Sequence, residues 1–138
     1  MIIKKMLSPF TERVYALLRL VSGSMLAFHG IQKLFGVLTT HQPPVGSQLW
    51  FGGVIECVCG TAIAIGFFTS EAAFLASGML AVAYIQFHWR FQGGAQLLPA
   101  INQGELALLY AWVFLLIACR GSGPWSVDGR RNAASNRT

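Results

Sequence analysis

Four long apolar segments, separated by short polar stretches, predict membrane-spanning helices. They cover residues 14–38, 49–68, 71–89 and 105–119. A spanning helix needs about 20 mostly apolar residues, so the last segment is short unless its first residue, Glu105, lies below the membrane surface. The apolar runs are continuous rather than alternating, which favours helices over strands. We therefore expect an all-α protein, a transmembrane four-helix bundle forming a single domain over residues 1–138.

The connections between these segments follow turn chemistry. The first, residues 39–48, contains Pro43 and further helix breakers, which a helix cannot continue through. Only Thr69 and Ser70 separate the second and third segments, so these should form a tight antiparallel hairpin. Either residue is a plausible N-cap for the third helix. The longest connection, residues 90–104, should lie at the same end of the bundle as the first.

Composition supports a membrane protein and weakens other classes. Hydrophobic residues make up 54% of the chain and charged residues 11%, against about 25% charged in ordinary soluble domains. So few charges could not cover a soluble surface. The three cysteines lack the spacing of a disulfide framework or a zinc site. The net charge of +5 comes from bases in the tails, which a bilayer explains better than nucleic acid does.

The distribution of Lys and Arg predicts the orientation. Basic residues cluster in the two tails, at Lys4, Lys5, Arg13, Arg120, Arg130, Arg131 and Arg137. The first and third connections together contribute only Arg90. Because basic flanks stay in the cytoplasm, we expect a multi-pass protein of the cell inner (plasma) membrane. Its N-terminus and its tail, residues 120–138, should both be cytoplasmic.

Small residues are spaced for close helix packing. Gly23, Ala27 and Gly30 form one stripe of the first helix, and Gly53 and Gly60 repeat at heptad spacing on the second. Small residues let helix backbones approach each other in lipid, where the hydrophobic drive between helices is lost. We interpret these positions as packing contacts rather than as a site.

Ionisable residues inside the spans form the candidate site. His29, Lys33, Glu56, His88 and Glu105 all belong to the outer third of the predicted bundle. His29 and Lys33 are four residues apart and so share a helix face. Ionisable groups in a membrane are costly and are functional candidates by default. We expect these five to border one binding pocket, with Lys33 paired to Glu56 or to Glu105; depth does not decide between them.

Arg19 is a secondary candidate, because it lies on the first helix towards the cytoplasm, away from the other five. A long basic side chain at that depth can extend to the inner headgroups. No catalytic residue and no metal ligand are predicted.

The same residues resemble a known family. The motif-bearing stretches are Arg19 to Gly36, with His29-Gly30 and Lys33; Gly53 to Gly66, with Glu56; Gly104-Glu105; and Gly121 to Asp128. They resemble the DoxX family over about residues 13–129. The chain departs from the family pattern in having Gln103, Ser122, Pro124 and Val127 where Gly, Pro, Arg and Leu are usual. The resemblance implies a four-helix membrane bundle related to the small subunit of a thiosulfate:quinone oxidoreductase.

Three functions remain open from the sequence. The first is a membrane subunit of a redox or quinone-linked system, at most one part of an oxidoreductase. Three scattered cysteines and no nucleotide fingerprint leave nothing to hold haem, flavin or an iron–sulfur cluster. This function therefore implies a protein partner that carries the redox chemistry, quinone as the candidate ligand and no covalently bound cofactor. The alternatives are a scaffold or assembly protein with a structural ion-pair cluster, and a small-solute or proton pathway. A homo-oligomer is compatible with all three.

Overall fold

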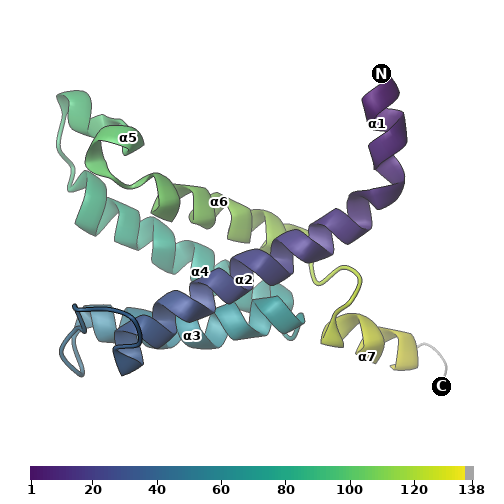
Figure 1. Cartoon of the computed structure of the whole chain (residues 1–138), viewed down its shortest axis with the longest axis horizontal. Coiled ribbons are helices and arrows are strands. Elements are labelled where there is room, and N and C mark those ends of the chain that lie inside the picture. The colour runs from purple at the N-terminus through teal and green to yellow at the C-terminus, as the bar shows by residue number, and fades with distance from the viewer. Residues whose placement is uncertain (136–138) are drawn as a thin grey trace.

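The computed structural model describes residues 1–135, and within them the chain forms helices and no strands (Figure 1). This confirms the predicted all-α fold class. Arg137, the last base counted towards the orientation, lies outside the described residues.

Four long helices make up the bundle. They are α2 (Thr11–Phe35), α3 (Gln48–Ile65), α4 (Thr69–Ala83) and α6 (Glu105–Arg120). Two of them are extended: α1 (Ile2–Leu7) and the 3₁₀ turn η1 (Ser8–Phe10) precede α2, and the π-helical segment η2 (Tyr84–Trp89) continues α4. Residues 2–35, 48–65 and 69–89 are then long and apolar enough to cross a membrane. At 16 residues, α6 falls short of the usual span of about 20, as the sequence indicated.

The long helices associate as two pairs, α2 with α3 and α4 with α6, linked by contacts between α3 and α4. The pairs converge at the end that carries α7 (Val127–Ser135). They separate towards the opposite end, where η3 (Gly94–Leu97) and α5 (Pro99–Asn102) form part of the connection that leads to α6 (Figure 1). The space between the pairs therefore widens towards the second end.

Glycines bring the backbones of α2 and α3 into contact. A Cβ added to Gly23 would lie 2.6 Å from the backbone nitrogen of Ala64. A Cβ on Gly30 would lie 2.6 Å from the carbonyl oxygen of Gly53, and one on Gly60 would meet the backbone of Ala27. No side chain fits at these crossings. The predicted packing role of the small-residue stripe is confirmed.

The second pair is joined through small side chains and a buried hydroxyl. Ala73 and Ala76 of α4 and Phe114 of α6 are fully buried in one apolar cluster. Ser77 Oγ donates a hydrogen bond of 2.7 Å to the carbonyl oxygen of Ala111. A hydroxyl that bonds across helices in this way helps to hold them together in lipid, where hydrophobic burial contributes little.

Arg19 is buried, with 1% of its surface exposed, so the expectation that it extends to the headgroups was wrong. One terminal nitrogen, Nη1, donates to the carbonyl oxygens of Ile63 at 2.5 Å and Ala64 at 2.8 Å. The other, Nη2, donates to the carbonyl oxygen of Trp125 at 2.9 Å. The last carbonyls of a helix have no partner within it. Arg19 supplies partners to the end of α3 and ties the segment after α6 to it.

The N-terminus of α4 is capped by Asp128, not by Thr69 or Ser70 as predicted. The Asp128 carboxylate accepts hydrogen bonds from the backbone nitrogens of Phe68 (3.1 Å) and Thr69 (3.0 Å) and from the Thr69 hydroxyl (2.9 Å). Burial alone would raise the pKa of this carboxyl, but these bonds and the charge of Arg131 outweigh it and hold the pKa below its usual range. A local cap is unnecessary because a residue from the C-terminal segment takes its place.

Gly66 lets this segment approach the α3–α4 turn. Its φ of +74° lies in the left-handed region, and a Cβ there would lie 2.9 Å from Arg19 Nη1 and would collide with the side chain of Ser126. The backbone nitrogen of Asp128 donates to the Gly66 carbonyl oxygen at 2.9 Å. Gly66 is therefore required both for its conformation and for its lack of a side chain.

Replacing the distant cap should destabilise the bundle in a pH-dependent way. Asp128→Asn should lower the free energy of unfolding by about 1 kcal/mol at neutral pH, because both carboxylate oxygens accept hydrogen bonds here, whereas an amide offers one oxygen and no charge to strengthen them. The folded-state pKa lies below the unfolded value of about 3.9. The cap's contribution is therefore complete above that pH and is lost as pH falls through the folded pKa.

Thermal unfolding in mild detergent at a series of pH values measures this. The difference in stability between wild type and Asp128→Asn should be constant from neutral pH to about pH 5 and should become smaller below about pH 4. Glu71→Gln is the control, since Glu71 is an exposed acid in the first turn of α4 and is not the cap. If Asp128→Asn lowers the stability no more than Glu71→Gln does, Asp128 is not the cap.

Candidate functional site

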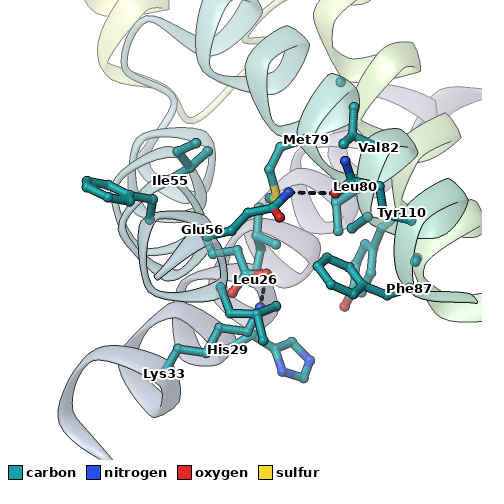
Figure 2. Close-up of a pocket in the computed structure, with 18 of the residues that line it drawn as sticks. Leu26, His29, Lys33, Ile55, Glu56, Met79, Leu80, Val82, Phe87 and Tyr110 are labelled. Carbon is teal, nitrogen blue, oxygen red and sulfur yellow. Dashed lines mark hydrogen bonds and ion pairs between the residues drawn. The ribbon is translucent and has the colours of Figure 1, made fainter. Parts of the chain in front are cut away.

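A cavity of about 790 Å³ lies between the two helix pairs, on the side where they separate. Side chains from α2, α3, α4, η2 and α6 line it, and most are apolar. In Figure 2, His29, Lys33 and Glu56 approach the cavity from one side, and Phe87 and Tyr110 from the other. A mostly apolar cavity with a few convergent polar groups is the usual form of a small-molecule site.

Lys33 pairs with Glu56, which answers the question that the sequence left open. Lys33 Nζ lies 2.5 Å from Glu56 Oε1, and the two side chains are 32% and 6% exposed. Gly53, one turn before Glu56, makes this possible, because a Cβ there would lie 2.8 Å from Lys33 Cβ. The glycine lets the lysine run along α3 to the carboxylate. The ion pair thus depends on the close α2–α3 contact.

The second carboxylate oxygen of Glu56 is unused. Oε2 is buried and accepts no hydrogen bond from any described residue. A buried polar atom without a partner costs about 1–3 kcal/mol, and more when it is charged, so such atoms are rare in folded proteins. The unused oxygen belongs to a residue that lines the cavity. The other buried side-chain atom without a partner among the described residues is Arg19 Nε, which lies away from the cavity.

Other polar side chains also line the cavity, namely those of His29, Gln48, Gln86, His88 and Gln103. His29 is half-buried, one helical turn from Lys33. Gln48 of α3 and Gln86 of η2 also line the cavity, and Gln48 Nε2 donates to Gln86 Oε1 at 2.5 Å. This bond bridges the two helix pairs. The two glutamines were missed from the sequence because they are uncharged and lie at the ends of apolar runs, where polar residues are ordinary.

The π-helical segment η2 places several lining residues. It covers Tyr84–Trp89 and contributes Gln86, Phe87 and His88 to the cavity. π-helical turns are rare, and many of those that do occur are found at functional sites. Widening the helix here changes the direction of these side chains relative to a regular α-helix. No sequence signal predicted this distortion.

His88 lines the cavity and also contacts the α5 segment. Its Nδ1 lies 3.3 Å from the carbonyl oxygen of Asn102. Asn102 is 9% exposed, and its amide donates to Tyr84 Oη at 3.3 Å and to the Gln96 carbonyl oxygen at 3.0 Å. This asparagine fixes the 90–104 connection against η2. It was also missed, since asparagine in a loop is a common turn residue.

The structure brings together four of the six predicted site residues: His29, Lys33, Glu56 and His88 line the cavity. Glu105 does not; it is exposed in the first turn of α6, where a negative charge favours the positive end of the helix. The position of a residue along its helix predicts its depth in the membrane. It does not predict whether the side chain of a residue at the start of a helix points into the bundle or away from it. Arg19 lies at the converging end, in the contacts described above.

The three cysteines form no disulfide with one another: Cys59 is buried, Cys57 half-buried and Cys119 exposed. Within residues 1–135, no group of three or more His, Cys, Asp or Glu side chains is placed to hold a metal ion. The polar side chains of the cavity thus offer hydrogen bonds and charge to a bound molecule.

The long apolar helices define a small helical membrane protein. The sequence model of the DoxX family matches residues 14–89, more than half of the chain. An uncharacterised protein from Haemophilus influenzae is 36% identical over 119 residues, which covers 83% of this chain and 88% of that protein. No solved structure matches. The chain belongs to the DoxX family.

The ion pair should behave as one coupled unit. Lys33→Met and Glu56→Gln should each destabilise the bundle, because each leaves the other group in the cavity without its partner. The double variant should cost less than the sum of the two. A coupling of about 0.5–3 kcal/mol is expected for groups in contact. Unfolding in mild detergent provides the free energies, and strict additivity would mean that the two side chains do not interact.

Proposed function

We propose that this protein is the membrane subunit of a quinone-linked redox system and binds a quinone headgroup in the cavity between the helix pairs. The single observation that carries the proposal is the buried, unused Oε2 of Glu56 beside a cavity with mostly apolar walls. A purely structural ion pair needs no such space next to it.

The chemistry of the lining residues fits a quinone ring. A quinone presents two carbonyl acceptors, and its reduced form presents two hydroxyl donors. His29 and Lys33 can donate to a carbonyl, and Glu56 Oε2 can accept from a hydroxyl. Phe87 and Tyr110 supply aromatic walls (Figure 2), against which a flat ring can stack.

Quinone reduction takes up two electrons and two protons, and different proteins supply these. The chain holds and orients the ring, and Glu56 and His88 handle protons at the cavity. The electrons come from a protein partner that carries the redox centre. Binding of the ring is therefore the property that this chain should show by itself.

A scaffold or assembly role is the second candidate. It is favoured by the 2.5 Å contact of Lys33 with Glu56, since an ion pair of this kind can fix helix register without any ligand. A small-solute or proton pathway has less support. At the converging end the ionisable Arg19 is occupied by three carbonyl oxygens, which leaves its terminal nitrogens engaged rather than available for a relay.

We place the protein in the plasma membrane with both termini in the cytoplasm. The end of the bundle that carries α1 and α7 (Figure 1) also carries basic residues from both tails, including Lys4, Lys5, Arg130 and Arg131. Arg90 lies at the other end. This asymmetry favours the α1 and α7 end as the cytoplasmic one.

Reporter fusions test this orientation. A cytoplasm-active reporter should be active when it is fused at the N-terminus or after Gly129. A periplasm-active reporter should be active only within the connection around Pro44. Activity of the second reporter at either tail would overturn the orientation and, with it, the placement of the cavity near the outer leaflet.

Quinone binding tests the function directly. The chain in lipid nanodiscs should bind a benzoquinone or a naphthoquinone saturably. Quenching of the protein's tryptophan fluorescence measures this binding. Glu56→Gln should weaken binding about tenfold or more, the usual effect of losing a hydrogen bond to a charged group. Glu105→Gln is the matched control and should bind like wild type, because Glu105 lies outside the cavity. Absence of saturable binding to wild type would favour the scaffold role instead.

A further inference from the structure

Several α3 and α4 residues that line the cavity are exposed, which places an opening to the surrounding lipid between these two helices. Two glycines face this opening, Gly52 of α3 and Gly78 of α4, and a Cβ added to either would meet nothing within 4 Å. Apolar side chains of both helices border it, and Phe51, Phe74 and Leu75 are each more than half exposed. In a membrane these side chains contact acyl chains, so the opening leads from the polar groups into the hydrocarbon.

These two glycines differ from those at the α2–α3 crossing. Gly23, Gly30 and Gly60 are required because a neighbouring backbone occupies the space of their side chains. Nothing within the described chain occupies the space at Gly52 and Gly78. A glycine within a helix is less favourable than alanine, so an open glycine at a cavity mouth is not accounted for by packing.

The polarity of the cavity changes along its length. Gly52 is one helical turn before Glu56 and therefore lies on the same face of α3. The charged group Lys33–Glu56 and His29 lie on the α2–α3 side, whereas the α3–α4 side is lined by apolar residues apart from the Gln48–Gln86 hydrogen bond at its outer end. A molecule that satisfies both parts has a polar head and an apolar tail.

We infer that the ligand of this site is a tailed amphiphile whose single isoprenoid or alkyl chain leaves the cavity between Gly52 and Gly78. The inference rests on the proposed function and specifies its ligand class. The head occupies the space beside Glu56 Oε2, and the tail crosses the gap that the two missing side chains leave. The tail then lies among the exposed apolar residues of α3 and α4, in contact with lipid.

Filling the gap tests this path. Gly52→Leu and Gly78→Leu place a side chain where the tail passes without a collision inside the protein. Two probes with the same quinone ring are compared in nanodiscs, one with an isoprenoid tail and one with a methyl group in its place. The tailed probe should lose about tenfold or more in affinity, as expected from overpacking a filled site. The methyl probe should bind as it does to wild type.

Val58→Phe is the control, because Val58 is an exposed residue of α3 that does not line the cavity. It should bind both probes like wild type. If the glycine variants lose affinity for both probes equally, the glycines belong to the ring site. That result would overturn the tail path but keep the proposed function.

Two other results would also overturn the inference. Unchanged binding of both probes, together with a change in particle size by light scattering, would show that the glycines contact a second copy of the chain. Absence of binding of either probe to wild type would remove the proposed function and the tail path together.

Discussion

The contact between the backbones of α2 and α3 is the constraint on which the rest of the structure depends. Because Gly23, Gly30 and Gly60 have no side chains, the two helices touch along their length. This contact places two charges of α2 next to their partners on α3. Arg19 meets the last carbonyls of α3 at one end, and Lys33 meets Glu56 at the other. A charge in a membrane is costly unless a partner is close, so the glycines make both charges tolerable.

Each end of this helix pair has one buried side-chain atom without a hydrogen-bond partner among the described residues, Arg19 Nε at one end and Glu56 Oε2 at the other, but the two ends differ in what surrounds that atom. At the converging end, Arg19 uses both terminal nitrogens, and Asp128 uses both carboxylate oxygens to cap α4. At the separating end, Glu56 uses one oxygen and keeps the other free beside a cavity. The first end is a closed junction that holds the helices together. At the second end the unpaired atom belongs to a residue that lines a cavity, which is the combination that a ligand site needs.

Family membership and site geometry contribute different parts of the conclusion. The DoxX match over residues 14–89 covers α2, α3 and α4, and thus the ion pair and the open glycines. It establishes the kind of protein, but a fold does not by itself define a function. The proposed function comes from the cavity, because its polar and apolar groups restrict the kind of molecule that it can hold. The C-terminal segment with Asp128 lies beyond the matched region.

The sequence by itself determined the class of protein, the four helices and most of the polar cluster, because continuous apolar runs of this length are typical of membrane spans and charges inside them must find partners. It also identified the packing glycines from their spacing. Only the tertiary structure decided that Lys33 pairs with Glu56, that Glu105 points away, that Arg19 is buried and that Asp128 caps α4. Each of these depends on which residues distant in sequence come within hydrogen-bonding distance. Periodicity fixes the depth and face of a residue on its own helix, but the rotation and crossing of the helices, set by backbone contact at glycines, decide what that face meets.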